Sequence, residues 1–361
     1  MKSIKAAVAA SVLIIAIITP NLSEQSVRNQ GVKKPASSAE LIKLLFSQPS
    51  KIYPLGEHNE KTIKQWIMTY SEGNLEYEKK VMRFRFNNDR ELITSYQQLI
   101  KGWKEMIDSG HLRMIHDLCV KFNVPFDIVF LALTESAWRK TANSSAGARG
   151  YWQFMSSTAK LYGLAVDSKK GVDERLDPVK STKAAIFLLR DNFKLTYGWD
   201  ELYNINSKKI PASARWQWAF WSYNKTPKLV SKYYGKLRGN PHQYPLYADN
   251  EESANYVNKI FAIKQVIKEY VKSENEKLKL INSKRGKTDT LIEQYIKNWH
   301  NLELFDRQKA LINIQEAYSK QYKNKAPDDI RKIYSAIERE KTYVDELVGE
   351  LNKFGYTISS K

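Results

Sequence analysis

Hydrophobic residues recur every three or four positions along most of the chain, which is the spacing of one face of an α-helix. In the first third, this pattern is carried by Leu41, Leu44, Leu45, Leu92, Tyr96, Leu99, Trp103 and Ile107. Pro49, Pro54 and Gly56 interrupt it and divide the segment into shorter helices. No stretch shows sustained alternation of apolar and polar residues, so the pattern predicts a mainly α fold without a substantial sheet.

The C-terminal part contains two further helical patterns. The first follows Leu291, Tyr295, Trp299, Leu302, Leu311, Ile314, Ala317 and Tyr318. Ala326-Pro327 ends this pattern, and Asp328-Asp329 begins a second one that continues to Leu351. We therefore predict an α-helical hairpin region over 271–361 with charged outer faces. It either packs on the rest of the chain as a solvated helical pair or docks to a partner.

The chain begins with a short basic segment followed by an apolar run. Lys2 and Lys5 precede mostly apolar residues from Ala6 to Ile18, and polar residues follow. This run is short for a membrane-spanning helix, so we predict a secretory signal peptide or N-terminal anchor over 1–22. Residues 23–40 are rich in Ser, Asn, Gln, Lys and Pro, a composition that predicts a linker.

The composition excludes several classes of site. The single cysteine, Cys119, rules out an intramolecular disulfide framework and any Cys-rich metal centre. The five histidines form no H-x-x-x-H pair, so we do not expect a zinc hydrolase, and nothing else in the sequence indicates a metal site or a cofactor. With 58 Lys+Arg against 39 Asp+Glu, the net charge of +19 favours an anionic partner. Export argues against nucleic acid, and we expect membrane association only through an uncleaved N-terminus.

A candidate catalytic carboxylate follows the most apolar helical segment. Asn123-Val124-Pro125 is typical of a helix start, and the six apolar residues at 128–133 predict a helix buried on several faces. Glu135 comes at the end of this run. An apolar setting raises the pKa of a carboxyl group, as a general acid near neutral pH requires. A helix-terminal glutamate in water or in a buried ion pair would fit the same pattern.

A loop of small residues at 141–150 leads directly into the aromatic segment Tyr151–Met155. Beside a buried glutamate, such a loop fits the floor of a cleft in which large aromatic side chains and an amide face the ligand. Aromatic faces pack on the C–H patches of sugars, and amides hydrogen-bond hydroxyl and N-acetyl groups. The segment therefore favours a saccharide ligand.

Five ordered blocks resemble the soluble-lytic-transglycosylase (SLT) domain family, goose-lysozyme-like enzymes that cleave peptidoglycan. Glu135-Ser136 and residues 146–155 resemble the signature E-S…G-A-x-G-L-W-Q-F-M-P. The later blocks, similar to T-A/G-x-x-Y-G-L, D-x-R-x-D-P-x-x-S-T-x-A-A, A-Y-N and E-T-x-x-Y-V, lie at 158–164, 173–185, 222–224 and 252–257. The resemblance is nearest to the membrane-bound D-type branch. It implies a lysozyme-like catalytic domain at 111–270, flanked by an N-terminal helical region at 41–110 and the C-terminal region.

The resemblance implies that Glu135 is the single catalytic acid and base of a peptidoglycan lytic transglycosylase. Glu135 would protonate the glycosidic oxygen between N-acetylmuramic acid (MurNAc) and N-acetylglucosamine (GlcNAc). It would then deprotonate the muramyl 6-hydroxyl, whose attack gives a 1,6-anhydro product with the substrate's acetamido group in the nucleophile's role. Tyr223 matches the tyrosine that orients the reacting groups. Substrate contacts are implied for Ser136, Tyr151, Trp152, Gln153, Met155, Asn224 and Glu252, with a structural role as the alternative for Glu252.

Three further residues in the matching blocks, Arg175, Asp177 and Thr182, are expected to brace the fold through caps and ion pairs. Other positions depart from the family pattern. Ser156 replaces the final proline of the signature, and Lys225-Thr226 stands where Ala-Gly is usual. These departures, with Tyr151 in place of leucine, bear on the substrate range more than on the chemistry.

Two alternatives to a lytic transglycosylase stay open at this point. A hydrolytic muramidase commonly needs a second carboxylate, for which Asp173, Asp177 and Glu252 are available. A non-catalytic cell-wall-binding scaffold protein would keep the basic, aromatic-rich surface without turnover. In each case we expect an exported protein of the periplasm or cell envelope of a bacterium, held by its positive charge on the anionic cell wall. The C-terminal helices would be available to other envelope proteins.

Overall fold

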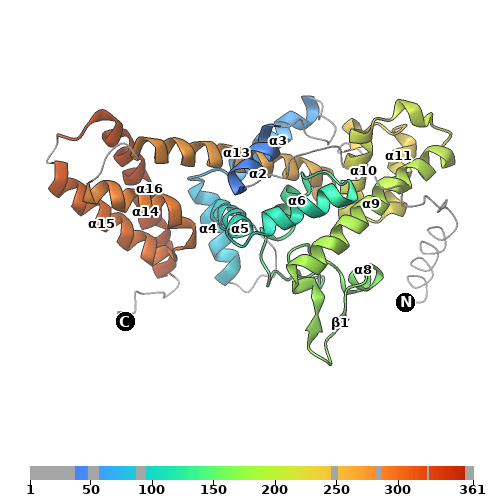
Figure 1. The fold of residues 1–361 in the computed structure, drawn as a ribbon, viewed down its shortest axis with the longest axis horizontal. Helices are drawn as coiled ribbons and strands as arrows, with labels where there is room; N and C mark the ends of the chain where they lie inside the picture. Colours follow the sequence, from blue (N-terminus) through green and yellow to red (C-terminus); the bar gives the residue numbers. More distant parts are fainter. Residues whose placement is uncertain are drawn as a thin grey trace. The chain divides into compact units, whose positions relative to one another are not determined.

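The computed structural model describes residues 37–47, 57–86, 95–244, 251–281, 286–322 and 325–353. Within these ranges it contains fourteen α-helices, four short 3-10 turns and one two-stranded antiparallel ribbon (Figure 1). The predicted mainly α fold is therefore confirmed. The signal peptide or anchor predicted at 1–22 and most of the predicted linker lie outside the described residues. None of the described helices combines the length and apolar character that crossing a membrane requires.

The described residues divide into two compact units, and each unit is assembled from segments that are distant in sequence. The first unit contains the described residues up to Asn59, together with Ile115–Asp127 and Ala185–Val257. The second contains Glu60–Met114, Ile128–Ala184 and the described residues from Asn258 onward. The domain boundaries expected from the sequence are contiguous ranges and stay a prediction.

The first unit is built around one nearly encased helix. Its elements are α2 (Ser38–Ser47), α10 (Ala212–Asn224), α11 (Pro227–Lys236), η2 (Ser207–Lys209), η3 (Pro241–Gln243) and parts of α3 (Glu57–Thr69), α6 (His111–Phe122), α9 (Pro178–Leu202) and α13 (Glu251–Ile281). All residues of α10 from Ala214 to Ser222 are buried. Its buried cation, Arg215, donates to Asp200 at 2.6 Å, which ties α10 to α9. A buried charge is tolerated only when it is paired in this way.

The second unit holds most of the remaining helices and the ribbon. Its elements are α4 (Leu75–Phe86), α5 (Tyr96–Asp108), α7 (Ile128–Ser136), α8 (Ser156–Leu161), β1 (Val166–Asp167), β2 (Val172–Asp173), η1 (Glu174–Leu176), α14 (Lys287–Asn298), η4 (Trp299–Asn301), α15 (Leu304–Tyr322), α16 (Asp328–Lys353) and the other parts of α3, α6, α9 and α13. The strands pair in register, with Val166 opposite Asp173 and Asp167 opposite Val172. They form a short hairpin and not a core sheet.

Helix α5 begins with a capping box and packs closely on α7. Ser95 Oγ accepts the backbone N–H of Gln98, and the Gln98 side chain accepts the backbone N–H of Ser95. The predicted apolar positions Leu99 and Trp103 are buried. A Cβ atom at Gly102 would lie 2.0 Å from the backbone carbonyl oxygen of Ala137, which directly follows α7. Only glycine allows the two backbones to approach this far.

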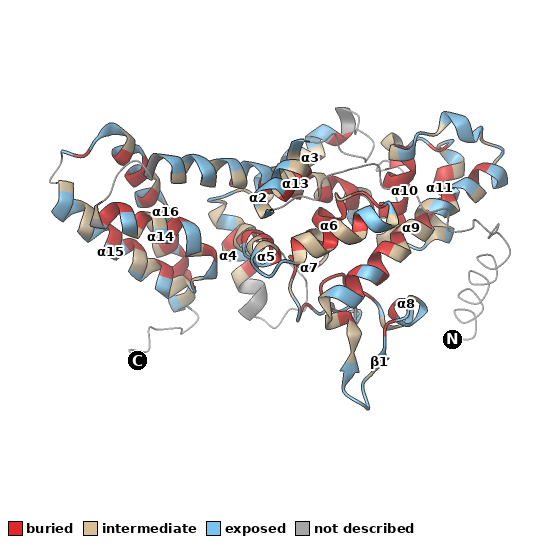
Figure 2. Cartoon of the chain, in the orientation of Figure 1, coloured by how far each residue is buried: buried red, intermediate tan, exposed pale blue. Residues whose placement is uncertain are grey.

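The C-terminal helices α14, α15 and α16 share one apolar core. Its buried members are Ile292, Tyr295, Ile296, Leu311, Ile314, Ile333, Tyr334, Ile337, Val344 and Val348. Figure 2 shows buried positions recurring along these helices between exposed ones. The predicted break at Ala326-Pro327 is confirmed, because α15 ends at Tyr322 and α16 begins at Asp328. The prediction of one helical pattern from Leu291 to Tyr318 is wrong. The 3-10 turn η4 and the extended residue Leu302 (ψ 135°) separate α14 from α15.

Within the second unit, the C-terminal helices pack on helices that precede the SLT-like segment. The ring of Tyr96 on α5 stacks on Trp299 of η4 with 5.9 Å between centroids. Lys104 on α5 pairs with Glu274 on α13 at 3.6 Å. Lys79 on α4 pairs with Glu346 on α16 at 3.3 Å. Chain segments on either side of the SLT-like blocks therefore form one packed body.

We expect Gly102→Ala to lower the free energy of unfolding by about 1–3 kcal/mol, because the added methyl group would overlap a buried carbonyl oxygen. Urea unfolding followed by circular dichroism measures the loss. Gly198→Ala on α9 is the matched control, because a Cβ at that helical glycine meets nothing within 4 Å. Equal unfolding midpoints for the two variants would contradict the close approach.

The stability should also depend on the protonation of His300. Its side chain is 1% exposed, and neither ring nitrogen has a hydrogen-bond partner among the described residues. Burial, assisted by Lys104 and Lys101, lowers the pKa of His300 to about 4. The unfolded chain takes up a proton below pH 6.5 while the folded chain does not, so stability is full above that value and falls toward pH 4.

We expect the free energy of unfolding to be about 1–2 kcal/mol lower near pH 4.5 than near pH 7.5 from this residue alone, after allowance for solvent screening. Urea titrations across this pH range measure the difference. In His300→Phe the slope of stability with pH should become shallower. An unchanged slope would show that the ring is not held neutral.

Candidate functional site

Helix α7 presents Glu135 at the end of a fully apolar stretch. Residues 128–133 have exposures of 0%, so the predicted buried helix is confirmed. Glu135 is half-buried and is the penultimate residue of α7. The carboxylate is therefore carried on a helix whose preceding turns are fully packed.

The chain leaves α7 through two successive non-glycine residues in the left-handed region. Ala137 has φ 50° and Trp138 has φ 57°, and both are completely buried. This conformation is costly for L-residues and persists only where packing holds it. The indole of Trp138 lies 4.5 Å from the Tyr151 ring centroid, and its Nε1 donates to His111 Nδ1 at 3.3 Å. These contacts fix the end of α7 and hence the position of Glu135.

Ser136 ties α7 to the segment after the loop. It is completely buried, and its Oγ donates to the backbone carbonyl of Tyr151 at 2.7 Å. A second carbonyl, that of Ala132, lies 3.4 Å from the same hydroxyl. The described hydroxyl contacts are thus to backbone, and the implied contact of Ser136 with substrate stays a prediction.

Gln153 braces the small-residue loop and leaves one acceptor unused. Its Nε2 donates to the backbone carbonyls of Ala142 at 3.1 Å and Gly150 at 2.9 Å. The residue is 9% exposed and takes φ 49°, which turns the chain tightly at this point. Its Oε1 is buried with no hydrogen-bond partner within the described parts of the chain. A donor on a ligand would satisfy this oxygen.

The aromatic residues that follow the loop are mostly core residues. The sequence led us to expect that these rings face a ligand. In the structure Tyr151 is 4% exposed and Trp152 is 0% exposed, so neither ring lies on an open surface. The reason is that Trp152 Nε1 donates to Thr182 Oγ1 at 2.9 Å and that Tyr151 packs on Trp138. Burial also raises the pKa of Tyr151. Met155, at 42% exposed, is open to a ligand.

Arg175 and Asp177 brace the fold as predicted. One Nη atom of Arg175 donates to the carbonyls of Gly147 and Phe154, both at 3.0 Å, while its Nε donates to Asp173 at 2.8 Å. The hydrogen bond from Arg175 to the Asp173 carboxylate lowers the pKa of Asp173. Asp177 accepts two backbone N–H groups in the first turn of α9, at 2.9 and 2.8 Å. Both carboxylates are therefore committed to structure.

In the first unit, the blocks at 222–224 and 252–257 come together at the end of α10. Tyr223 and Asn224 are half-buried there. Asn224 Oδ1 accepts the Ser253 hydroxyl at 3.5 Å, and Trp221 Nε1 donates to the backbone carbonyl of Ser253 at 3.1 Å. Glu252 is exposed beside them. Two blocks that are separate in sequence thus form one local arrangement.

The predicted site residues are divided between the two units. Those in the second unit are Glu135, Ser136, Tyr151, Trp152, Gln153 and Met155, and those in the first are Tyr223, Asn224 and Glu252. Within the described residues, no group of three or more His, Cys, Asp and Glu side chains is arranged to hold a metal ion. Sequence reasoning missed Gly102 and Trp138, since nothing in the local sequence marks a close backbone approach or a left-handed helix end.

Comparisons with known proteins single out the same segment of the chain. Residues 119–243 match the family model of the transglycosylase SLT domain, a range that includes Glu135, Gln153 and Tyr223. The chain is also similar to membrane-bound lytic murein transglycosylase D of Escherichia coli, in strain K12 and in strain O6:H1. Each match is 29% identical over 150 residues, which is 41% of this chain and 29% of the relative.

The aligned part thus spans less than a third of the length of the curated relatives. The range 119–243 that matches the SLT family model includes Glu135, the braced loop and the end of α10. Residues 119–243 are therefore similar to the transglycosylase SLT domain, and the chain shares sequence similarity with membrane-bound lytic murein transglycosylase D.

Proposed function

We propose that this protein is a peptidoglycan lytic transglycosylase that cleaves the β-1,4 bond between MurNAc and GlcNAc and leaves a 1,6-anhydro-MurNAc end. The observation that carries the proposal is the placement of Glu135. It lies half-buried at the end of a helix enclosed by packing, inside the segment that matches the SLT domain. The E. coli relatives are named lytic murein transglycosylases, which supports the same activity here.

In the proposed reaction, Glu135 works first as an acid and then as a base. Its proton passes to the glycosidic oxygen as the bond from the muramyl C1 to that oxygen breaks, which releases the GlcNAc hydroxyl. The acetamido oxygen of MurNAc supports the positive charge at C1. The ionised Glu135 then takes the proton of the muramyl 6-hydroxyl while O6 bonds to C1. The carboxyl group is regenerated, and no water is consumed.

The fixed geometry of α7 supports this double role. A group that gives and takes a proton at two sugar oxygens must stay within hydrogen-bond reach of both, so its carrier has to be rigid. The buried turns of α7 and the packed Trp138 provide that rigidity. Glu135 itself is half-buried, so part of its side chain is open to a substrate.

Other described groups suit the sugar substituents. The unused Gln153 Oε1 would accept from an N-acetyl N–H or a hydroxyl. We infer that Tyr223 orients the reacting groups, that Asn224 contacts substrate, and that Met155 packs on a sugar face. We further infer that Glu252, which is exposed next to Ser253, contacts the glycan, with a structural role as the alternative.

The structural hydrogen bonds of Asp173 and Asp177 weigh against the alternative that the protein is a hydrolytic muramidase. A muramidase of the two-carboxylate type needs a second carboxylate that is free to activate water. Asp173 accepts a hydrogen bond from Arg175, and Asp177 caps α9.

We further propose that the protein acts in a bacterial cell envelope, where its +19 charge concentrates it on anionic polymers of the wall.

Glu135→Gln should reduce turnover of purified sacculi at least about 10³-fold, because the amide neither gives nor takes the required proton. Soluble products separated by chromatography and identified by mass spectrometry measure the rate and the product. Wild-type products should carry anhydro ends, one water lighter than hydrolysis products. Glu201→Gln, at an exposed position on α9, is the matched control and should retain full activity. Unchanged turnover in Glu135→Gln, or products with ordinary reducing ends, would refute the proposal.

Tyr223→Phe should lower kcat about 10–100-fold with a small change in KM, because the missing hydroxyl would orient the reacting groups. Steady-state release of soluble glycan from sacculi measures both constants. Tyr197→Phe is the matched control, since Tyr197 is 46% exposed on α9. Equal kcat for Tyr223→Phe and wild type would remove Tyr223 from the reaction. An equal thermal midpoint shows that the fold is unaffected.

A further inference from the structure

A cavity of about 590 Å³ lies within the second unit, away from the SLT-matching segment in sequence. It is enclosed by the turn after α3, the start of α5, the C-terminal half of α13, and helices α14 and α16 with η4 between them. A volume of this size falls in the range of ligand-binding pockets, about 300–1,000 Å³. None of the residues that line it belongs to the five SLT-like blocks.

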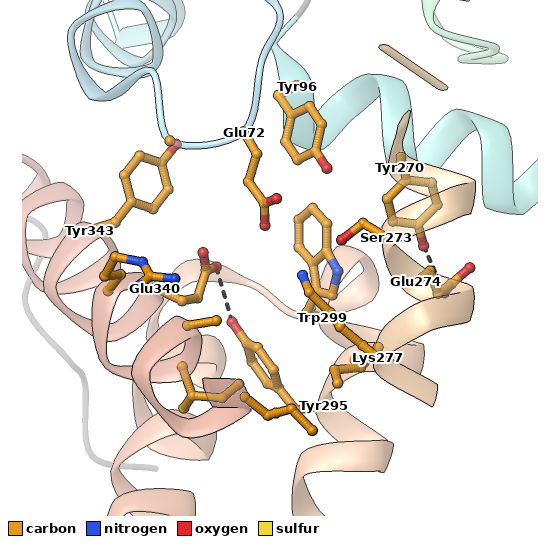
Figure 3. A pocket seen from close by; sticks show the side chains of 16 residues that line it. Glu72, Tyr96, Tyr270, Ser273, Glu274, Lys277, Tyr295, Trp299, Glu340 and Tyr343 are labelled. Atoms are coloured by element: carbon orange, nitrogen blue, oxygen red, sulfur yellow. Dashed lines mark hydrogen bonds between the residues drawn. The ribbon is translucent and has the colours of Figure 1, made fainter. Parts of the chain in front are cut away.

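The walls of the cavity are strongly aromatic. Figure 3 shows the rings of Tyr96, Trp299, Tyr295 and Tyr343 around it. Tyr96 and Trp299 stack with an interplanar angle of 12°, which holds both rings in place. Rigid aromatic surface of this kind is well suited to the C–H faces of a ring-shaped ligand, since little side-chain entropy is lost on binding.

Several polar groups that line the cavity have no hydrogen-bond partner among the described residues. These groups are the hydroxyls of Tyr96 and Tyr343 and the indole N–H of Trp299, all on half-buried residues, and the carboxylate of Glu72, which is exposed. In Figure 3 the Glu72 carboxylate points into the cavity. Burial raises the pKa of Tyr96 and of Tyr343, so both hydroxyls remain protonated donors at neutral pH.

The other two carboxylates are already compensated. Glu340 pairs with Arg307 and accepts the hydroxyl of Tyr295, while Glu274 pairs with Lys104. Lys277 and Arg339 add positive charge to the lining. Charges of both signs are therefore matched around the cavity, and neither a simple cation nor a simple anion is selected by net charge.

The cavity lining combines aromatic rings with hydrogen-bond donors and acceptors that have no partner among the described residues. Such a lining suits a ligand that both donates and accepts hydrogen bonds and has apolar ring faces. A neutral sugar has this combination. We propose that this cavity is a second, non-catalytic saccharide-binding site that accommodates one or two sugar rings. The choice of an N-acetylated glycan as the natural ligand rests on the proposed function, whereas the saccharide chemistry rests on the cavity alone. Such a site would keep the enzyme on a glycan strand between cleavages.

Binding of chitotriose, a GlcNAc trimer, to the full chain carrying Glu135→Gln tests the proposal without turnover. Isothermal titration calorimetry should report two sites, one of them lost or weakened at least tenfold when Glu72→Gln and Tyr343→Phe are added. These changes remove one acceptor charge and one hydroxyl without emptying the packed walls. Glu76→Gln with Tyr318→Phe, outside the cavity in the same unit, is the matched control and should leave both sites intact.

A diazirine-labelled chitotriose gives a local readout. After photolysis, mass spectrometry should find cross-linked peptides from residues 295–299 and 339–343 in the Glu135→Gln chain and lose them in the cavity variant. Absence of these cross-links, or unchanged affinity in the cavity variant, would overturn the proposal.

A competition experiment distinguishes a saccharide from an organic cation. Displacement of the labelled chitotriose by cadaverine at lower concentration than by chitobiose would also overturn the proposal, in favour of an organic cation. Lytic activity measured with Glu135 intact is a separate assay, so failure of one proposal is distinguishable from failure of the other.

Discussion

The contact between the backbone of α5 at Gly102 and the carbonyl of Ala137 governs the geometry of the candidate site. It allows α7 to end in two left-handed residues, and this turn sends Trp138 into the core against Tyr151. Glu135 lies two residues before Ala137 and is therefore carried at the packed end of α7. The packing of several side chains compensates the backbone strain at Ala137 and Trp138. The candidate site therefore depends on Gly102, which lies outside the SLT-like blocks.

The mainly α fold and the position of Glu135 could be predicted because both depend on local information. The apolar run at 128–133 indicates a buried helix from periodicity alone, and Arg175 and Asp177 fulfil structural roles that their residue types favour. The burial of Tyr151 and Trp152 could not be predicted, since it depends on Trp138 and Thr182, which the chain brings to them through the fold. Hydrophobic periodicity predicts a helix, but it does not predict the tertiary contacts of the residues that follow it.

The same limit explains the C-terminal region. A helical pattern with charges of both signs predicts helices, yet nothing in it indicates that Trp299 breaks the pattern to stack on Tyr96 of α5. That stack joins residues 203 positions apart in the chain and encloses the cavity. Contacts of such separation depend on topology. The sequence therefore predicted a helical hairpin that packs on the rest of the chain or docks to a partner, but it could not identify α5 as a helix on which this region packs.

Under the proposed functions, charge and cavity would act on different parts of one polymer. The net charge of +19 attracts polyanions at a distance, weakens with salt and does not distinguish one sugar from another. The cavity works at contact range and has its charges compensated, as Lys104 does for Glu274 and Arg307 for Glu340. A site that relied on charge would need an excess of one sign. Under these proposals, charge would account for affinity toward an anionic wall, and hydrogen-bond complementarity would account for selection of the glycan.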